Sequence, residues 1–464
     1  MELSWTSSGV DLHLEMNGRG QRSSLEDALR SAIQDRRLAA GTAVPSTRAL
    51  ASDLGVARGT VVAAYDQLIA EGYLIARRGV GTQVADLGPV AAATAERTRS
   101  SGIRFDLRAG SPDVTSFPVS TWTACMRRAL AVAPASAFDY SDVRGRLELR
   151  SALVDYLART RGVRARPEQI MITAGATHAL SLLSIALTAA GETTIAMENP
   201  GFAMHRPVLR QGGQRVIPLP VDDRGADIEA LGAEVPAAVV VTPAHQYPTG
   251  VTMHPMRRHA LTTWARASDA IIIEDDYDGE FRYERQPIGA LQGTAPDQVV
   301  YLGTTSKTLA PGLRLGWMVL PHRWIDPLIT VKVRADLSAP AITQLTAAEM
   351  ITGHRYDRHI RTMRLRYRRR RDLLLGVLNA IKPGVVTGIA AGMQVPVALP
   401  ATGPSEREII LAAADEGLAI EGLSRHWHGG VAPTRGLLIG FSKPSEAAYP
   451  AAVSLLARIL RRML

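Results

Sequence analysis

Short apolar segments alternate with helical patterns over residues 103–464, and this alternation is the feature that most constrains the fold. Seven of these segments are strand candidates: residues 170–173, 194–197, 216–219, 238–242, 270–274, 299–302 and 316–320. Neighbouring parallel strands need a crossover connection, which is usually a helix. The alternation therefore predicts a large α/β domain with a mostly parallel sheet flanked by helices.

Residues 1–84 show a different pattern, in which three short helices precede a hairpin. The helical patterns cover about residues 23–36, 46–55 and 58–72, and Ser46 after Pro45 is a good N-cap for the second. Residues 73–84 then predict two short strands joined by a glycine turn. This order is typical of a winged helix-turn-helix domain. Residues 85–102 are rich in Ala, Ser, Thr and Arg without apolar periodicity, which predicts a flexible linker.

The predicted winged domain offers polar side chains at the places where such domains meet DNA. These side chains begin the second helix, begin the third helix or lie on the hairpin: Ser46, Thr47, Arg48, Arg58, Thr60, Arg77 and Arg78. Helix N-termini and arginines bind phosphates, and the start of a recognition helix meets base edges. The pattern favours binding to double-stranded DNA. The alternative is a small helical packing module with a solvated hairpin.

Composition excludes some partners and leaves others open. The net charge is +9, but nine arginines balance nine acidic residues up to residue 84, so the DNA hypothesis rests on pattern. We find no signal peptide, and the longest apolar stretch, residues 180–190, is too short to span a bilayer. We expect a cytoplasmic protein. The single cysteine, Cys125, excludes an internal disulfide and a cysteine-built zinc site, and we expect it in the core.

The strongest chemical pattern surrounds Lys307. Only four of the 53 basic residues are lysine, so a retained lysine is a candidate for chemistry that guanidinium cannot perform. Here a strand ends, Thr304 and Ser306 precede Lys307, and Arg314 follows. An enzyme that uses pyridoxal 5′-phosphate (PLP) needs a lysine for the aldehyde, and hydroxyls and an arginine for the phosphate. The alternative is a surface lysine after a strand.

A second acidic segment fits the same cofactor. The apolar strand over residues 270–274 leads into Asp275 and Tyr277, which can hold a protonated ring nitrogen and a ring hydroxyl. By itself this segment is equally compatible with a metal site or a solvated loop. Phe202 offers a ring for stacking. Gly175, Ala176 and Thr177 precede an apolar helix whose amides can bind phosphate.

The N-terminal region closely resembles the GntR family of bacterial repressors. The resemblance rests on Val44–Pro45–Ser46–Thr47–Arg48–Ala49–Leu50–Ala51, on residues 55–68, which begin Gly55–Val56–Ala57–Arg58–Gly59–Thr60, and on Glu71–Gly72–Tyr73–Leu74. It implies operator binding by Arg48, Arg58, Thr60 and the wing around Gly79 and Gly81. Gly59 departs from the pattern, because such helices more often carry a polar residue there.

Residues from about 105 to 464 resemble a fold-type I aminotransferase with a small C-terminal α/β subdomain. The resemblance implies that Lys307 is the Schiff-base lysine, Asp275 the ring-nitrogen partner, Tyr277 the ring-hydroxyl partner, and Phe202 the stacking ring. It implies phosphate ligation by Thr304, Ser306 and Arg314. Tyr140 would reach the phosphate of a neighbouring subunit. Tyr247 stands where a transaminase usually has asparagine.

The fusion of these two regions resembles the MocR/GabR subfamily of GntR-type regulators. Its members respond to PLP, or to an amine or amino acid that reacts with PLP, and are typically domain-swapped homodimers. The resemblance implies a PLP-dependent transcription regulator. Relatives in this subfamily control vitamin B6 synthesis, GABA use, taurine use or cell-wall precursors, and no single residue of this chain distinguishes between these roles.

One departure bears on the activity. Transaminases hold the substrate carboxylate with an arginine on a late strand, but residues 436–442 are aliphatic where that arginine would fall. Arg425 and Arg435 lie nearby without being at that position. We therefore expect an effector sensor with at most residual half-transamination. The alternatives are an active aminotransferase with a DNA-binding head, and a regulator whose pocket has lost the cofactor.

Two further patterns have plain explanations. His426 and His428 have no third ligand in view, so we expect no metal site. The nine arginines of residues 355–371 predict one solvated helix, part of which packs.

Overall fold

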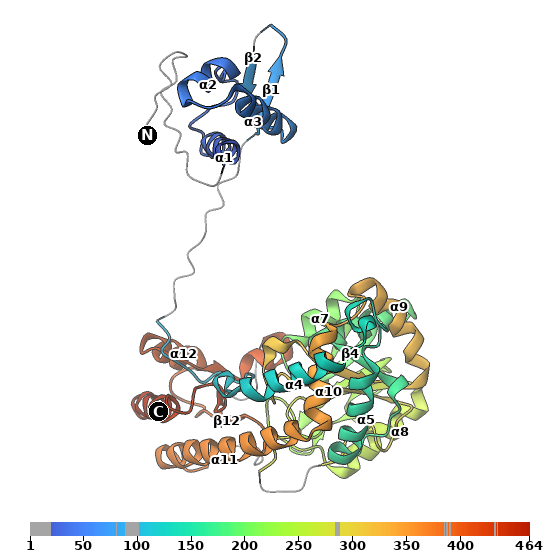
Figure 1. Cartoon of the computed structure of the whole chain (residues 1–464). Helices are drawn as coiled ribbons and strands as arrows, with labels where there is room; N and C mark the ends of the chain where they lie inside the picture. The colour runs from blue at the N-terminus through green and yellow to red at the C-terminus, as the bar shows by residue number, and fades with distance from the viewer. Residues whose placement is uncertain are drawn as a thin grey trace. The chain divides into compact units, whose positions relative to one another are not determined.

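The computed structural model describes residues 20–79, 81–88, 102–283, 288–384, 386, 388, 391–430, 433 and 435–464 (Figure 1). Its contacts divide the chain into two compact units, Met1–Arg99 and Ser100–Leu464. The predicted domain boundaries at residues 84 and 103 stay predictions. Most of the predicted linker, residues 89–101, lies outside the described residues.

The first unit is built from three helices and a hairpin, as predicted. Its elements are α1 (Gln21–Gln34), α2 (Thr47–Leu54), α3 (Arg58–Ala70), β1 (Leu74–Arg77) and β2 (Gly81–Val84). The Ser46 hydroxyl accepts a hydrogen bond from the Ala49 amide and so caps α2, and Gly55 ends that helix in the left-handed region with φ 65°. Strands β1 and β2 pair antiparallel. Leu25, Leu29 and Leu68 belong to a core formed entirely within this unit.

An eight-stranded mixed sheet forms the centre of the second unit. Its order is β4-β11-β10-β9-β8-β5-β6-β7. The strands are β4 (Ile170–Thr173), β5 (Thr194–Asn199), β6 (Arg215–Asp222), β7 (Gly225–Ala226), β8 (Ala238–Val241), β9 (Ile271–Asp275), β10 (Val299–Thr304) and β11 (Gly316–Val319). Strands β6, β5, β8, β9 and β10 run parallel, whereas β11 is antiparallel to both neighbours. All seven predicted strands and the mostly parallel sheet are confirmed.

Helices cover both faces of this sheet. They are α4 (Val119–Val132), α5 (Leu147–Arg161), α6 (Ala176–Ala189), α7 (His205–Gln211), α8 (Pro255–Ser268), α9 (Ile325–Ala335) and α10 (Ala341–Thr352). Successive side chains of a strand point to opposite faces. In β9, Ile271 and Ile273 therefore pack with residues of α6 and α9, while Ile272 packs with residues of α8. This alternation explains why the central strands are apolar throughout. Cys125 of α4 is fully buried, as predicted.

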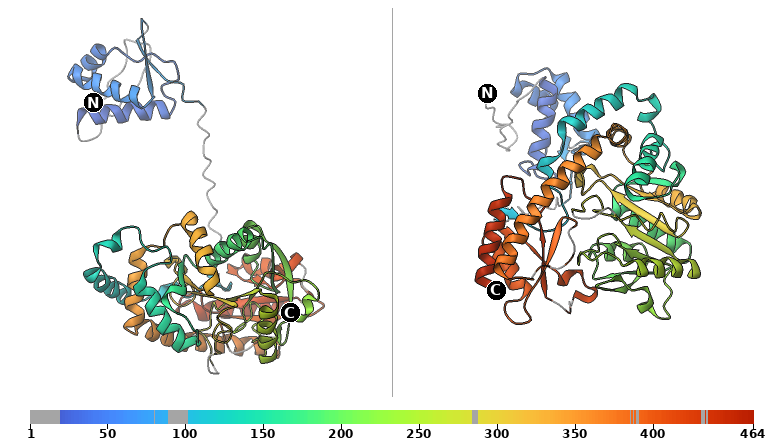
Figure 2. Two further views of the ribbon diagram at one scale, coloured as in Figure 1. Left: turned by 90° about the vertical axis from the view of Figure 1, so that its right-hand side faces the viewer. Right: turned by 90° about the horizontal axis from the view of Figure 1, so that it is seen from below.

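A smaller subdomain follows the large sheet in sequence. Its strands are β12 (Gln394–Ala398), β13 (Leu418–Ala419), β14 (Glu421–Gly422) and β15 (Gly436–Gly440), and its helices are α11 (Arg355–Ile381), α12 (Glu406–Asp415) and α13 (Tyr449–Met463). Strands β12, β15 and β14 form an antiparallel sheet, and β13 pairs in parallel with β3 (Phe105–Asp106). Helix α11 packs against α13, which in turn packs against α12 (Figure 2).

Helix α11 is a single solvated helix of which part packs, as its sequence predicts. Tyr356, Ile360, Met363 and Tyr367 are buried at helical spacing, and Arg370 is buried with them. The rest of its arginines are exposed or half-buried. Several short 3₁₀ helices complete the unit: η1 (Val114–Ser116), η2 (Ala135–Phe138), η3 (Pro167–Gln169), η4 (Ile228–Leu231), η5 (Pro311–Leu313), η6 (His322–Trp324), η7 (Ser424–His426) and η8 (His428–Gly430).

Candidate cofactor site and DNA-binding surface

The ends of neighbouring strands bring the predicted cofactor residues together. Strand β9 ends at Asp275, and β10, its parallel neighbour, ends at Thr304 shortly before Lys307. A cavity of about 210 Å³ opens there. Ten of the predicted residues line it: Gly175, Ala176, Thr177, Phe202, Asp275, Tyr277, Thr304, Ser306, Lys307 and Arg314. The lining also includes residues that the sequence did not single out for this cavity: Gly110, His205, Thr242, Tyr247, Pro311, Met393 and Gln394.

Lys307 lies deep in this cavity. Its Nζ donates a hydrogen bond to the Gly110 carbonyl. Burial lowers the pKa of Lys307, and the nearby carboxylates of Asp275 and Asp278 oppose this effect. A lowered pKa increases the share of neutral amine, which is the form that attacks an aldehyde.

Asp275 is a buried carboxylate that lacks a full set of partners. Its Oδ1 has no hydrogen-bond partner among the described residues, and its Oδ2 lies 4.0 Å from Nδ1 of His205. Burial raises the pKa of Asp275 to about 7, while the charge of Lys307 lowers it. Burial lowers the pKa of His205 to about 3, so this imidazole is neutral. An unpartnered carboxyl at this depth fits a cofactor with a protonated ring nitrogen.

The Tyr277 hydroxyl is held in place by two neighbours. It lies 2.9 Å from Nδ1 of His245 and accepts a hydrogen bond of 3.0 Å from Nε2 of Gln394. The same His245 nitrogen lies 2.8 Å from Oδ2 of Asp278. These contacts fix the orientation of the Tyr277 ring, as a partner for a cofactor hydroxyl requires.

The opposite end of the cavity is suited to a phosphate. Gly175, with φ 101°, precedes α6, whose first amides have no partner within the helix. A Cβ at Gly175 would lie 3.7 Å from Nη1 of Arg314, so glycine leaves room beside this guanidinium. The Arg314 side chain has no hydrogen bond to any described residue. Thr304 and Ser306 complete this end, and their hydroxyl oxygens are 2.9 Å apart. The residues present therefore fit PLP.

An apolar cluster that includes the cavity residues Tyr247 and Tyr277 lies beside the cavity. Tyr247, Tyr277 and Leu438 form a buried cluster against which Phe202 packs. The Phe202 ring stands edge-on to Tyr247 at 5.3 Å between centroids. Leu438 comes from β15, the late strand on which an arginine is missing.

The two arginines near that strand are engaged elsewhere. Arg435 donates hydrogen bonds to the carbonyls of Ala401 and Gly403, at 3.0 Å each. Arg425 pairs with Glu421 at 3.3 Å. Neither lines the cavity, so neither replaces the missing carboxylate ligand in this structure.

Tyr140 lies apart from the other predicted cofactor residues. It follows η2, is 85% exposed and does not line the cavity of its own chain. Its predicted role toward a neighbouring subunit stays a prediction.

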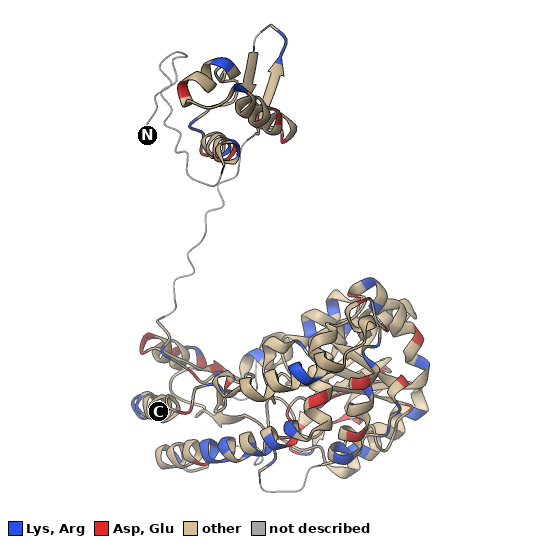
Figure 3. Ribbon diagram, viewed as in Figure 1, with Lys and Arg blue, Asp and Glu red and all other residues tan. Residues whose placement is uncertain are grey.

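The predicted DNA-binding residues lie on the surface of the first unit. Arg48 is in the first turn of α2, Arg58 begins α3, and Arg77 and Arg78 lie at the tip of the hairpin (Figure 3). These four arginines are exposed and make no hydrogen bond or ion pair with a described residue. Ser46, Thr47 and Thr60 lie beside them at the starts of the same two helices. The hairpin turn uses Gly79 and Gly81 at φ 82° and 102°. Free guanidinium groups on one small unit suit phosphate contacts.

The described residues include neither a membrane-spanning helix nor a metal-binding cluster of side chains. None of their helices combines the length and the apolar character needed to cross a membrane. No three His, Cys, Asp or Glu side chains gather among them so as to hold a metal ion.

Comparison with known proteins follows the same division into two parts. Residues 21–84 match the bacterial regulatory proteins of the gntR family, and residues 105–421 match aminotransferase class I and II. The HTH-type pyridoxine biosynthesis transcriptional regulator PdxR of Corynebacterium glutamicum is 34% identical, over 94% of this chain and 96% of that protein. The probable rhizopine catabolism regulatory protein MocR of Rhizobium meliloti is 32% identical, over 90% and 89%. This chain belongs to the MocR/GabR subfamily of GntR-type transcription regulators.

A solved structure supports the same conclusion for the second unit of this MocR-type regulator. The kynurenine aminotransferase of Pyrococcus horikoshii is 27% identical, with a TM-score of 0.70 over 78% of this chain and 92% of that chain. The winged helix-turn-helix with a fold-type I aminotransferase-like domain is thus confirmed, as is PLP as the cofactor of this fold. The role of each predicted residue stays a prediction.

Proposed function

We propose that this regulator senses PLP itself and controls genes of pyridoxine biosynthesis. The observation behind this proposal is the small number of basic side chains that line the cavity. Among the described residues that line it, Lys307 is the only lysine and Arg314 the only arginine. Arg314 is needed for the phosphate, so no second arginine is left for the carboxylate of an amino acid. The similarity to a pyridoxine biosynthesis regulator supports the same proposal.

Each group of the cavity has a defined task in this proposal. Lys307 captures the aldehyde, Arg314 and the amides at the start of α6 hold the phosphate, and Asp275 keeps the ring nitrogen protonated. Tyr277, fixed by His245 and Gln394, meets the ring hydroxyl. Bound PLP supplies an electrophilic carbon and a dianion, and the protein uses both for recognition.

The presence of PLP affects DNA binding because two arrangements of the protein differ in their affinity for PLP. PLP binds one arrangement of the protein better than another, and the two arrangements differ in how the winged units meet an operator. The winged units contact DNA through Arg48, Arg58, Thr60 and the hairpin. Residues 85–102 connect the two units as a linker, and the protein acts in the cytoplasm.

The test is a fluorescence-anisotropy titration of the protein on its own upstream DNA, with and without PLP. We expect PLP to change the affinity or the stoichiometry, and Lys307→Ala to abolish the change while leaving DNA binding intact. Arg334→Gln, an exposed arginine on α9, is the matched control. An unchanged titration in the presence of bound PLP would refute PLP as the signal and direct the search to amines and amino acids.

An active aminotransferase is the second candidate, favoured by one observation. The groups that aminotransferase chemistry uses at the cofactor are all present in the cavity, and the fold matches a kynurenine aminotransferase. Sustained conversion of an amino acid and a keto acid would support this candidate. We expect no such turnover, or a single half-reaction, because the buried Leu438 stands on the strand where a carboxylate ligand is needed.

We further propose that the protein is a homodimer, domain-swapped as in its subfamily, in which Tyr140 completes the partner's phosphate site. Exposed apolar side chains are concentrated around α4 and η2: Val119, Leu130, Val132, Phe138, Tyr140 and Leu147. Such a surface suits a second copy of the chain.

Mixing two inactive chains tests this arrangement. A Tyr140→Phe chain lacks the partner hydroxyl and a Lys307→Ala chain lacks the amine. Mixed dimers restore a complete site at about half of the lysine-bearing positions if Tyr140 acts across the interface. Mixing restores nothing if Tyr140 serves its own chain, and sedimentation shows whether the dimer exists.

A further inference from the structure

The first residues of the second unit run directly to the cofactor cavity. Residues 102–113 are here called the leading segment. In sequence they follow the predicted linker that comes from the DNA-binding unit. The segment pairs first with the small subdomain: the Phe105 amide donates to Gly417 O at 2.9 Å and the Leu107 amide to Ala419 O at 2.8 Å. The Gly440 amide then donates to Leu107 O at 2.7 Å.

At its centre the leading segment touches the reactive amine. The Gly110 carbonyl accepts the hydrogen bond from Nζ of Lys307, and this is the one hydrogen bond that Nζ makes to the described residues. Gly110 has φ 104°, a conformation that favours glycine. The carbonyl that contacts Lys307 thus lies ten residues after the start of the unit.

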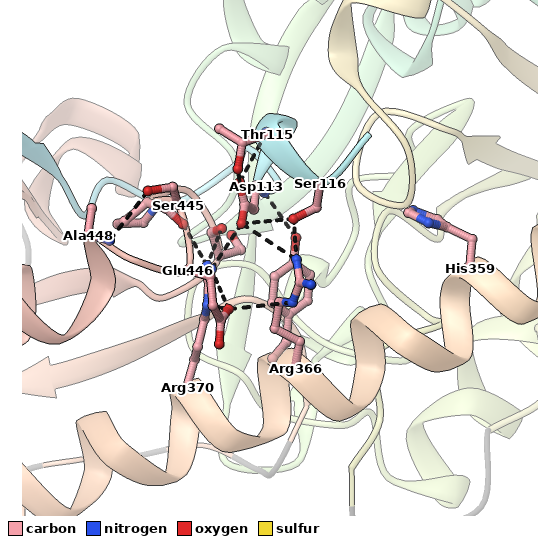
Figure 4. Close-up of polar contacts among 12 residues, drawn as sticks. Asp113, Thr115, Ser116, His359, Arg366, Arg370, Ser445, Glu446 and Ala448 are labelled. Carbon is pink, nitrogen blue, oxygen red and sulfur yellow. Dashed lines mark hydrogen bonds and ion pairs between the residues drawn. The ribbon is translucent and has the colours of Figure 1, made fainter. Parts of the chain in front are cut away.

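At its end the leading segment is anchored by Asp113 and Arg370 of α11 (Figure 4). Arg370 Nη2 donates to Oδ2 of Asp113 at 2.9 Å, and both side chains are buried. Arg370 also donates to Glu446 Oε2 at 2.9 and 3.1 Å, and to the carbonyls of Ser442 at 2.9 Å and Pro444 at 2.7 Å. These acceptors occupy all five N–H groups of the guanidinium.

A second bond ties the segment close to Gly110. The Ser442 hydroxyl donates to the Ser111 carbonyl at 2.7 Å. Ser442 follows β15, so the anchor spans α11, the end of β15 and the leading segment. These contacts hold the Gly110 carbonyl within reach of Nζ.

We infer that Arg370 is a positioning residue for Lys307, and that it couples the state of the amine to the leading segment. This inference rests on the proposed function. The free amine and the observed position of the segment stabilise each other, because the bond between them exists only when both are present.

The chemistry of capture breaks this bond. When Lys307 condenses with the aldehyde, a bond forms between Nζ and the aldehyde carbon, and the oxygen leaves as water with two amine hydrogens. Gly110 then loses its donor while the anchor at Asp113 remains. The part of the segment before Gly110, which leads toward the DNA-binding unit, is then held only by its hydrogen bonds to the small subdomain.

Hydrogen exchange of the full-length protein, with and without PLP, tests the inference. The amides of Phe105, Leu107 and Ala109 are hydrogen-bonded in this structure. We expect peptides over residues 102–112 to exchange several-fold faster once absorbance shows bound PLP, and Lys307→Ala to show no change. Unchanged or slower exchange with PLP bound would overturn the inference. Absence of any PLP absorbance would instead refute the proposed function.

Variants of Arg370 and Ser442 give a second test, in which a rise and a fall of the PLP affinity have opposite meanings. Arg370→Gln and the milder Ser442→Ala should make the segment exchange quickly even without PLP. Both should raise the affinity for PLP about fivefold, because a competing hydrogen bond is lost. Arg369→Gln, an exposed arginine next to Arg370 on α11, is the matched control. A purely structural role would lower the PLP affinity instead, and that result in both variants would overturn the inference.

Discussion

Lys307 and Asp275 illustrate how burial prepares single residues for a cofactor. Both side chains lie in a cavity at the ends of neighbouring strands, where solvation of a charge is poor. Burial moves the pKa of the amine down and the pKa of the carboxyl up, so both groups shift toward their neutral forms. A cofactor that brings a positively charged ring nitrogen stabilises the ionised form of Asp275. Lys307 is meanwhile kept nucleophilic.

Asp275 should therefore make the stability of the cofactor-free protein depend on pH. Its pKa is raised from 3.8 to about 7 in the folded protein. Between these values the folded protein binds a proton that the unfolded chain releases, so stability falls as the pH rises. At pH 8 Asp275→Asn should raise the unfolding free energy by about 4 kcal/mol. Near pH 4 this gain should disappear. Denaturation at the two pH values measures this, and an equal effect at both would contradict it.

Most of the cofactor residues were predictable because each lies in a local pattern. Lys307, Thr304 and Ser306 follow a strand end, and Asp275 ends another strand. His205 and Gln394 were not predicted, because nothing in their local sequence shows that α7 and β12 meet at this cavity. The same holds for Gly110, which no pattern distinguishes from other loop glycines.

Among the elements, α11 is the one whose successive parts pack against different regions of the second unit. Its first part packs with α5 and α10, and its middle carries Arg370 into the anchor of the leading segment. Its last turns cover the sheet of the small subdomain through Leu374 and Leu378. One helix thus contacts both parts of the second unit.

Gly376 is a weak point in this helix. It lies within α11, and a Cβ at this position would meet no atom within 4 Å. Gly376→Ala should raise the unfolding free energy by about 1 kcal/mol, because glycine has a low helix propensity. Chemical denaturation measures the gain. PLP binding serves as a control and should not change, and a loss of stability would show that the site is less open than it is here.

The strands that the sequence predicted differ from those it did not predict in their length and in their apolar pattern. Central strands such as β9 are buried on both faces and stand out as apolar runs. Strands β3, β7, β13 and β14 have two residues each, which is too short for any periodicity. Their pairing depends on segments far away in the chain, which a local pattern does not contain.

At the scale of the whole molecule, charge is unevenly divided. Residues 1–99 hold 11 arginines and 11 acidic residues, which leaves 42 basic and 33 acidic residues for the rest of the chain. The entire net charge of +9 therefore lies in the second unit. The DNA-binding unit must rely on the placement of individual arginines and not on a general positive field.

DNA binding should accordingly show a salt dependence that reflects individual contacts. Each of Arg77→Gln and Arg78→Gln should reduce the slope of log affinity against log salt by about 0.9, the value for one lost phosphate contact. Anisotropy titrations at several salt concentrations measure the slope. Arg22→Gln is the control, because Arg22 pairs with Glu26 on α1 at 2.6 Å. Unaltered slopes in both hairpin variants would place the hairpin away from the phosphates.

The pairing of β3 with β13 has a consequence for synthesis of the chain. Phe105 of β3 meets its partner Leu418 of β13 only 313 residues later, whereas the core of the DNA-binding unit closes within residues 25–84. On the ribosome, the DNA-binding unit is therefore complete long before the cofactor site can form. A chain that ends before β13 would keep a folded DNA-binding unit but would lack the proposed response to PLP. The proposed control of DNA binding by PLP therefore requires a completely translated chain.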